Sequence, residues 1–233
     1  MDGMVVNGNT GADPRIALVG VGGAGCNVID MLHRNACAAD TIAINTDKES
    51  MGRTSAGKKL YICKGVLKGQ GARGDADVGR NCADAHRAEI EKALEGYDFV
   101  FVLTGLGGGT GSGATPVVLN YAKALGAHTY TIAINPFFFE GPRKKVASSA
   151  YQMIKGMCPD TMLIDNDLVL RNMPHLTADE AYKEVNRSIA RYIDICISTI
   201  HDNIRVEMGK MGSTSYDGYD VPEEFPLANI ISA

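Results

Sequence analysis

Two glycine-rich runs are the residues whose type and spacing most clearly indicate chemistry. The longer run, residues 105–113 (GLGGGTGSG), follows an apolar stretch at 99–103 and precedes residues 114–125, which have the spacing of an amphipathic helix. Glycines let a backbone approach phosphate oxygens, and a helix start adds free N–H donors and the positive end of its dipole. A flexible linker would not lie between a buried strand and a helix. The run therefore predicts a phosphate-binding loop, with Thr110 and Ser112 as hydroxyl donors.

The second run has the same context earlier in the chain. Residues 15–20 (RIALVG) are apolar, residues 20–27 (GVGGAGCN) are glycine-rich, and a helix is expected over 28–34. This GxGxxG run, with Asp47 some way downstream, also fits the fingerprint of an NAD-binding protein. A dinucleotide enzyme has no need of a second phosphate loop, so the two runs together favour a triphosphate held from two sides. Residues 52–59 (GRTSAGKK) lack the Ser/Thr of a P-loop and are set aside.

Short apolar runs alternate with helical patterns along the chain. Alternation of this kind predicts a doubly wound parallel α/β sheet, with the ligand at the carboxyl ends of the strands. A long helix is expected from 178 to about 201, because its apolar residues keep helical spacing. We expect a flexible segment at 1–14, one domain at 15–201 and an extension without a second domain at 202–233. Further strands are expected at 41–45, 60–63, 129–134 and 161–164, helices at 80–94 and 146–157, and a loop at 65–79.

Composition narrows the class of protein. The chain has 233 residues, of which 45% are hydrophobic and 21% charged, and this balance is ordinary for a globular domain. A net charge of −4 argues against nucleic acid as a partner. No apolar run is long enough for a membrane span and no signal peptide is evident, so we expect a cytoplasmic protein without direct membrane insertion. The six cysteines show neither CxxC nor zinc spacing, which favours reduced, buried thiols.

The run GGGTGSG resembles the GGGTG[ST]G signature of the tubulin/FtsZ family, and the resemblance extends over residues 15–200. It implies a Rossmann-like GTPase domain with a long C-terminal core helix that binds GTP or GDP with Mg²⁺ and associates with copies of itself as a dimer or filament. Residues 136–141 (PFFFEG) resemble the sugar-binding loop of the family, in which Glu140 fits ribose hydroxyls and Phe137 and Phe139 fit core packing. The nucleotide contacts implied are Gly22, Gly23, Ala24, Gly25, Asn27, Asn45, Thr46, Asp47, Gly71, Ala72, Arg73, Gly107, Gly108, Gly109, Thr110, Gly111, Ser112, Glu140, Lys144, Asn166, Tyr182 and Asn186.

Base recognition also has a physical argument. Tyr182 and Asn186 are four residues apart and so share one face of the long helix. An aromatic ring can stack on a purine while an amide one turn later pairs with its Watson–Crick edge. The alternative is a surface tyrosine and a surface asparagine. The family resemblance favours guanine recognition.

The chain also departs from the family pattern. The family continues past the long helix into a C-terminal domain, for which no length remains. The acidic loop expected after that helix reads HDNIRVE at 201–207, with Asp202 and Glu207 wrongly spaced, so they are only weak catalytic candidates. Lys144 stands where FtsZ usually has arginine, and no metal ligand is assigned among the side chains.

Arg73 replaces a family glycine beside the expected γ-phosphate. Its guanidinium could neutralise phosphate charge from within the chain, as an arginine finger does, or it could face solvent and pair with Asp75 or Asp77. The resulting prediction is a self-associating, FtsZ-like cytoskeletal protein of cell division and a slow GTPase. The alternatives are a non-hydrolysing GTP/GDP-binding structural or regulatory module and, less favoured, an NAD-binding protein.

Overall fold

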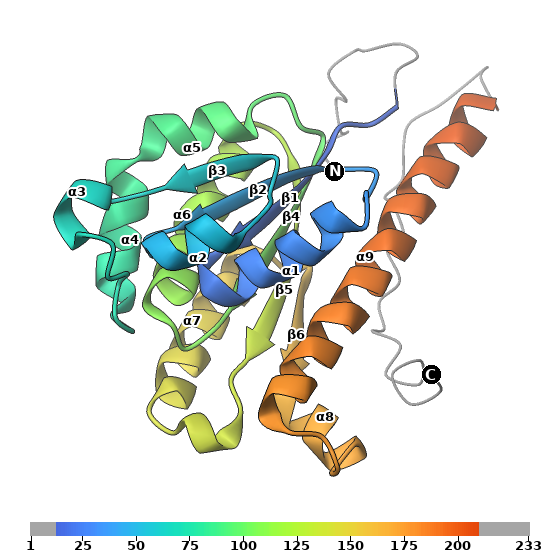
Figure 1. Ribbon diagram of the computed structural model, residues 1–233. Helices are drawn as coiled ribbons and strands as arrows, with labels where there is room; N and C mark the ends of the chain where they lie inside the picture. The colour runs from blue at the N-terminus through green and yellow to red at the C-terminus, as the bar shows by residue number, and fades with distance from the viewer. Residues whose placement is uncertain (1–12, 210–233) are drawn as a thin grey trace.

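A six-stranded parallel sheet forms the centre of the molecule (Figure 1). The structure is a computed structural model that describes residues 13–209, without the side chains of 205–209. The strand order is β3-β2-β1-β4-β5-β6, and every neighbouring pair is parallel. The expected doubly wound α/β sheet is thereby confirmed. The strands are β1 (Ile16–Val21), β2 (Asp40–Asn45), β3 (Lys58–Tyr61), β4 (Phe99–Gly105), β5 (His128–Asn135) and β6 (Thr161–Asp165).

Helices cover both faces of the sheet, which explains why β1 and most of β4 are buried along their length. Side chains on one face pack against α4 to α7, and those on the other against α1, α2, α8 and α9. The helices of the first face are α3 (Lys64–Leu67), α4 (Ala76–Ala85), α5 (Arg87–Leu94), α6 (Gly109–Ala124) and α7 (Arg143–Met157). Those of the second are α1 (Gly22–Arg34), α2 (Lys48–Arg53), α8 (Asn166–Asn172) and α9 (Ala178–Gly209), and the short η1 (Phe138–Glu140) follows β5.

The strand order reverses between β1 and β4, which are neighbours in the middle of the sheet. The helix that follows β1 packs on one face of the sheet, and the helix that follows β4 packs on the other. Such a reversal opens a crevice at the carboxyl ends of the two strands, where doubly wound proteins bind their ligands. Both glycine-rich runs follow these two strands.

The glycine-rich runs are more helical than expected. α1 begins at Gly22 rather than residue 28, and α6 begins at Gly109 rather than residue 114. Glycine has a low intrinsic helix propensity, but tertiary packing routinely overrides it. Six of the ten glycines in the two runs are therefore helical.

Two other segments also differ from expectation. The helix expected over 80–94 is two helices, because the backbone leaves the helical conformation at His86. The loop expected over 65–79 contains most of α3 and the beginning of α4. Asp75 starts α4 by accepting hydrogen bonds from the backbone N–H groups of Asp77 and Val78.

The long helix α9 does not end near residue 201 but continues to Gly209. Ile197 and Ile200 are buried, and Ile204 packs against the same core, so the apolar stripe extends one turn further than the sequence analysis recognised. Residues 201–207 are therefore helical and do not form a loop after the helix. Residues 1–12 and 210–233, on which the expected flexible start and most of the expected extension fall, lie outside the described residues.

The expectation of six reduced thiols is wrong for one pair. Cys63, directly before α3, forms a disulfide with Cys82 of α4, and their Cα atoms are 5.5 Å apart. The two cysteines are 19 positions apart in the sequence, so their proximity follows from the fold. Cys26, Cys158 and Cys196 are buried free thiols and Cys37 is a half-buried one. No helix in the described range is both long enough and apolar enough to cross a bilayer.

Candidate functional site

The two glycine-rich helix starts meet at the carboxyl edge of the sheet. Gly22 has φ +73°, and a Cβ atom placed on it would lie 2.8 Å from the backbone nitrogen of Gly111. A side chain at Gly22 is therefore excluded by both conformation and space. The first turns of α1 and α6 lie against each other, so their unpaired N–H groups and positive dipole ends are adjacent.

The glycines of this edge fall into two kinds. A Cβ atom on Gly25 would lie 2.1 Å from the Leu103 carbonyl oxygen, and one on Gly111 would lie 2.2 Å from the Gly105 oxygen. These glycines are needed for packing. A Cβ atom on Gly23 or Gly108 would meet no protein atom within 4 Å. The absence of side chains at these two positions leaves a cradle of backbone that an anion can enter.

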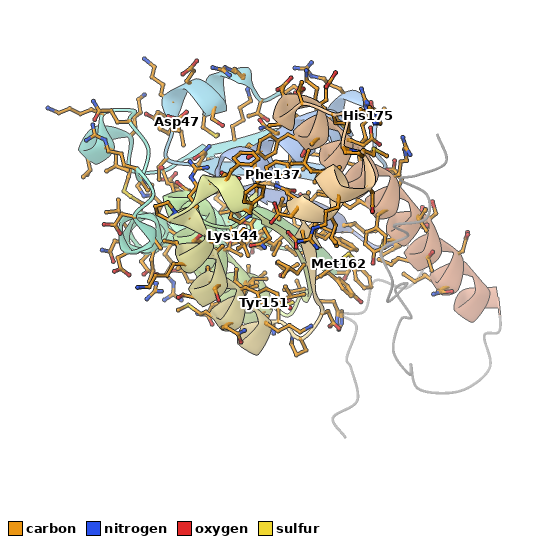
Figure 2. All side chains as sticks on the ribbon, turned by 90° about the horizontal axis from the view of Figure 1, so that it is seen from below. Asp47, Phe137, Lys144, Tyr151, Met162 and His175 are labelled. Atoms are coloured by element: carbon orange, nitrogen blue, oxygen red, sulfur yellow. A yellow bond between two sulfur atoms is a disulfide. The ribbon has the colours of Figure 1, made fainter. Side chains whose placement is uncertain are left out.

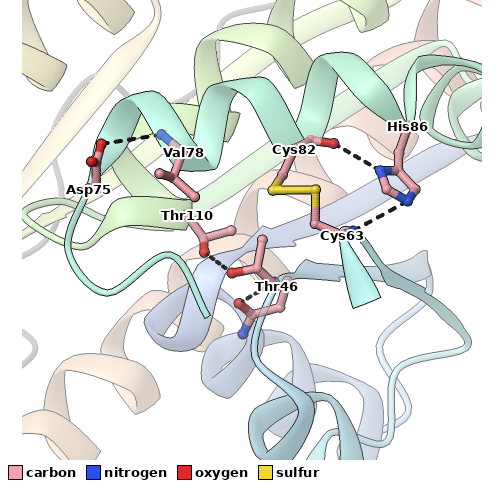
Figure 3. The surroundings of a disulfide bond; sticks show 8 residues. Thr46, Cys63, Asp75, Val78, Cys82, His86 and Thr110 are labelled. Carbon is pink, nitrogen blue, oxygen red and sulfur yellow. Dashed lines mark hydrogen bonds between the residues drawn. A yellow bond between two sulfur atoms is a disulfide. The ribbon is translucent and has the colours of Figure 1, made fainter. Parts of the chain in front are cut away.

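Threonine and serine hydroxyls bind the loops together. Thr46, which follows β2, and Thr110 of α6 share a hydrogen bond of 2.7 Å between their hydroxyl oxygens (Figure 3). Ser112 Oγ accepts a hydrogen bond of 2.9 Å from the backbone nitrogen of Gly107. Because that contact uses a lone pair of Ser112, its own proton remains available to an acceptor.

Asn45 and Asp47 shape the end of β2. The Asn45 carbonyl Oδ1 accepts from the backbone N–H of Thr46 at 2.8 Å, and its amide donates to the Ser50 hydroxyl at 3.0 Å. Asp47 accepts from the backbone N–H of Ser50 at 2.7 Å and so caps α2. Both side chains, implied as nucleotide contacts, also have these structural roles.

A third segment, residues 69–75, lies against the start of α6. A Cβ atom on Gly109 would be 2.7 Å from the Cβ of Ala72 and 2.6 Å from the Asp75 oxygen. Arg73, in the same segment, is exposed with φ +47°. Within residues 13–209 it forms no ion pair with Asp75 or Asp77, so the predicted surface pairing is not found. The finger role stays a prediction.

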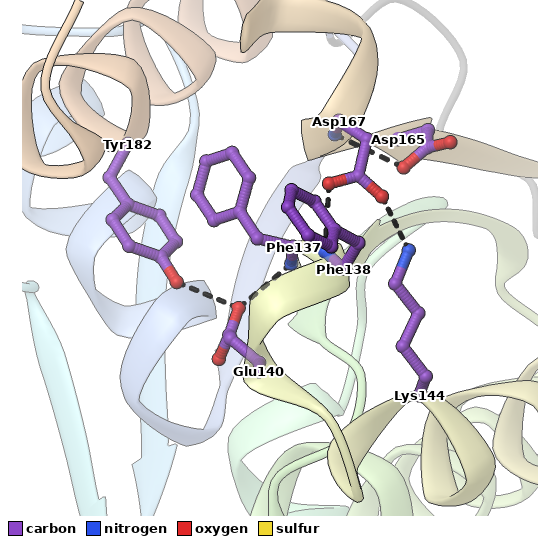
Figure 4. Close-up of polar contacts among 7 residues, drawn as sticks. All are labelled: Phe137, Phe138, Glu140, Lys144, Asp165, Asp167 and Tyr182. Atoms are coloured by element: carbon purple, nitrogen blue, oxygen red, sulfur yellow. Dashed lines mark hydrogen bonds and ion pairs between the residues drawn. The ribbon is translucent and has the colours of Figure 1, made fainter.

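The opposite side of the edge is built from side chains (Figure 4). Glu140 Oε1 accepts hydrogen bonds from the Phe137 backbone N–H at 2.9 Å and from the Tyr182 hydroxyl at 2.8 Å, while Oε2 pairs with Arg143 at 2.7 Å. Burial, followed by the hydrogen bond to the Glu140 carboxylate, raises the pKa of the Tyr182 hydroxyl. Tyr182 on α9 is thereby tied to the loop after β5.

Asp167 makes the second link on this side. It accepts from the Phe138 backbone N–H at 2.8 Å and from Lys144 Nζ at 2.6 Å (Figure 4). Burial opposes ionisation of Asp167, but the hydrogen bonds from Lys144 and Phe138 outweigh it and lower the pKa of the carboxyl. The sequence analysis selected only the neighbouring Asn166 and not Asp167. The missed signal is Asp165, the last residue of β6, whose side chain accepts a hydrogen bond from the Asp167 backbone N–H and caps α8.

The aromatic residues of the PFFFEG loop have different surroundings. Phe137 is fully buried and lies edge-on to Tyr182, with ring centroids 4.8 Å apart. The core role expected of Phe137 is confirmed, but that of Phe139 is wrong, because Phe139 is 52% exposed. Phe138 is 71% exposed. Figure 2 views this side from below and labels Phe137 after β5, Lys144 at the start of α7 and Asp47 after β2.

Three asparagines implied as nucleotide contacts come from three helices. Asn166 at the start of α8 is buried, and its Oδ1 has no hydrogen-bond partner among the described residues. Asn27 on α1 is exposed and Asn186 on α9 is half-buried. α9 contacts both α1 and α8. A buried acceptor without a partner is costly, so Asn166 fits a ligand donor.

The catalytic candidates are less well placed. Asp202 is exposed on α9, away from any loop, and the side chain of Glu207 lies outside the described residues. In the part of the chain that the structure describes, no group of three or more histidines, cysteines or carboxylates could hold a metal ion.

A parallel sheet whose strand order reverses between two glycine-started helices defines a doubly wound domain of the nucleotide-binding kind. Residues 15–174 match the family model described as "Tubulin/FtsZ family, GTPase domain". The chain belongs to the tubulin/FtsZ family.

Curated relatives agree with this assignment. The chain is 38% identical to cell division protein FtsZ 2 of Methanocaldococcus jannaschii over 189 residues, which are 81% of this chain and 50% of the relative. It is 35% identical to FtsZ of Neisseria gonorrhoeae over 72% of this chain and 43% of the relative. The chain thus spans about half the length of the curated relatives it matches.

Solved structures show the same fold. An empty FtsZ dimer of M. jannaschii matches with a TM-score of 0.79 and 31% identity, covering 85% of this chain and 61% of that one. A GTPγS-bound protofilament of CetZ2 from Haloferax volcanii matches with a TM-score of 0.72 and 26% identity, covering 79% and 58%.

Proposed function

We propose that this chain binds GTP and GDP at the carboxyl edge of its sheet, associates with copies of itself and hydrolyses GTP slowly in the cytoplasm. The observation that carries the proposal is the contact between the starts of α1 and α6, with Gly23 and Gly108 open above it. Backbone N–H groups in such a cradle bind phosphate oxygens. The match to the family's GTPase domain and the GTPγS-bound CetZ2 structure support the guanine base, and likeness to FtsZ cell division proteins supports the cell-division role.

On the opposite side of the edge, which we call the base side and which contains Glu140, Asp167 and Tyr182, side chains would contact the rest of the nucleotide. The exposed part of the Tyr182 ring would stack on the base, with amide groups from Asn186, Asn27 and Asn166 along its edges. The partnerless Oδ1 of Asn166 supports this arrangement, because a guanine N–H would satisfy it. Glu140 would exchange the Tyr182 hydroxyl for a ribose hydroxyl. Mg²⁺, when bound to the triphosphate, would neutralise its charge and take most of its ligands from phosphate and water.

Self-association is supported by two observations. Structures similar to this chain are a dimer and a protofilament. In this chain, Phe138 and Phe139 are exposed next to the proposed site, and exposed aromatic residues are typical of contact surfaces. A second copy seated there would cover both rings.

A matched pair of glycine substitutions tests the binding site. Gly23 and Gly156 are both exposed helical glycines whose added methyl group would meet no protein atom. Both alanine variants should be folded and slightly more stable, because alanine favours the helix. We expect Gly23→Ala to release much less nucleotide than wild type on denaturation and ion-exchange chromatography, and Gly156→Ala to release about one per chain. Equal nucleotide in both variants, or an adenine dinucleotide, would contradict the proposal.

Phosphate release measured over a range of protein concentrations tests hydrolysis. An assembling GTPase has a specific rate that rises with concentration, whereas a non-hydrolysing module releases no phosphate.

Arg73→Ala tests the arginine-finger role. The side chain of Arg73 is exposed, so the variant should keep its stability and GTP affinity but should hydrolyse GTP more slowly. Unchanged turnover would remove Arg73 from the proposal.

A further inference from the structure

The Cys63–Cys82 disulfide joins the two ends of the segment that packs against the start of α6, where the phosphates are proposed to bind (Figure 3). Cys63 lies shortly after β3, and Cys82 lies in the second turn of α4. The chain between them contains α3 and residues 69–75. The bond therefore fixes both ends of this segment.

The segment between the cysteines touches two parts of the proposed site. Gln70 forms an isolated antiparallel bridge with Asp47, and the Gly69 oxygen accepts from the Lys48 backbone N–H at 3.3 Å. Ala72 lies directly beside Gly109, the first residue of α6. A displacement of this segment would change the backbone around the first turn of α6.

His86 holds the two cysteines together independently of the sulfur–sulfur bond (Figure 3). Its Nε2 accepts from the Cys63 backbone N–H at 3.3 Å, and its Nδ1 is 3.0 Å from the Cys82 oxygen. A neutral ring with the proton on Nδ1 satisfies both contacts. The two thiols of the reduced protein would therefore stay close enough for the bond to form again.

The surroundings of this pair also distinguish it from the other cysteines. Cys26 and Cys196 are buried in the core on the other face, and burial raises the pKa of the Cys26 thiol to about 12. Cys63 and Cys82 are also buried, with exposed fractions of 8% and 3%. However, α3 next to Cys63 is a single helical turn without a buried residue, and Val66 within it is 78% exposed. Local opening of so short an element exposes the disulfide to a dithiol reagent at low cost.

We propose that Cys63 and Cys82 are a redox modification site that controls how firmly residues 69–75 are held over the phosphates, an inference that rests on the proposed nucleotide site. The oxidised form binds GTP more tightly because the segment is ordered in advance. In the reaction, the two thiols lose two protons and two electrons and form one disulfide. A disulfide co-substrate such as oxidised glutathione accepts them and becomes two thiols.

Nucleotide affinity in the two redox states tests the control. Wild-type protein is equilibrated with oxidised or reduced glutathione, and GTPγS and GDP binding is measured by calorimetry. We expect reduction to weaken GTPγS binding about threefold to tenfold, and GDP binding less, because an unconstrained loop must be ordered on binding. The double variant Cys63→Ser/Cys82→Ser should bind like reduced wild type in both buffers. Cys37→Ser, which removes a half-buried free thiol, should respond like wild type. Equal affinity in both redox states of the wild type would overturn the proposal.

A second measurement tests the bond without nucleotide. Lys64, Lys68 and Arg73 are exposed between the two cysteines and are sites for trypsin. After a brief digestion of oxidised protein, we expect the nicked chain to stay whole on a non-reducing gel and to separate on a reducing gel. Separation on both gels of the two fragments produced by a cut between Cys63 and Cys82 would show that no such bond forms and would overturn the proposal. If the bond is present but neither redox state binds GTPγS, the proposed nucleotide site fails and, with it, the control of that site.

Discussion

The two sides of the proposed nucleotide site, the phosphate side formed by the starts of α1 and α6 and the base side formed by Glu140, Asp167 and Tyr182, are built in different ways. The phosphate side is backbone: two helix starts, at Gly22 and Gly109, that are in contact because they carry no side chains there. The base side is a side-chain network in which Glu140 and Asp167 each hold two or more partners. A side chain added at one of the packed glycines should displace a whole helix start, whereas a side-chain network should lose one link at a time.

The largest expected effect is on the backbone side. Gly111→Ala would place a methyl group 2.2 Å from the Gly105 carbonyl oxygen, so the start of α6 must move away from β4. We expect the free energy of unfolding to fall by about 3 kcal/mol, since a rigid backbone atom cannot be displaced cheaply. Urea unfolding measures it. Gly23→Ala is the control in the neighbouring helix, and a loss of similar size there would remove the distinction between the two kinds of glycine.

A smaller loss of unfolding free energy than that of Gly111→Ala is expected for a substitution of Asp167. Asp167→Asn keeps an acceptor for the Phe138 N–H but leaves Lys144 without its carboxylate, and the free energy of unfolding should fall by about 2 kcal/mol at pH 7. Lys144→Met, which removes the other partner, is a companion variant: it should also be less stable, because the Asp167 charge is then left buried.

The stabilisation by Asp167, measured with Asp167→Asn, should depend on pH. The folded pKa of Asp167 is lowered, so its contribution is present above the unfolded pKa of about 4 and is lost as the pH falls through the folded pKa. The difference in unfolding free energy between wild type and Asp167→Asn should be constant at neutral pH and shrink below about pH 4. Urea titrations at several pH values measure it. A difference that grows in acid would contradict the assigned direction.

The smallest effect is expected for Tyr182→Phe. The ring keeps its edge-on contact with Phe137, and only the hydrogen bond to Glu140 is lost, so the free energy of unfolding should fall by about 1 kcal/mol. The variant should also bind nucleotide no worse than wild type, because the stacking surface is unchanged. A loss as large as that of Gly111→Ala would mean that the base side is as cooperative as the backbone side.

Much of the fold could be read from local patterns. Apolar runs at β1, β2, β4 and β5 gave the parallel sheet, because a strand buried on both faces needs a continuous apolar sequence. Element ends were less predictable. The end of α9 was missed because the stripe that includes Ile200 and Ile204 continues past charged residues that looked like a loop.

The candidate site was predictable where glycine spacing carries the information and less so where contacts join distant segments. The pairing of Lys144 with Asp167 joins residues of α7 and α8, and that of Tyr182 with Glu140 joins α9 to the loop after β5. No local pattern marks such partners. The exposure of Phe139 was misjudged for the same reason, because an aromatic triplet does not state which ring faces the core.

The sequence by itself determined the two strands β1 and β4 and the presence of a helix after each glycine-rich run, because apolar runs and helical spacing are properties of residues close in the chain. The start of these helices within the glycines, at Gly22 and Gly109, was decided by tertiary packing. The tertiary structure alone decided that these helices touch at Gly22 and Gly111, and that Cys63 meets Cys82. Those contacts depend on the order of the strands in the sheet and on the face to which each helix returns. That order is fixed by the packing of the whole core rather than by any one segment.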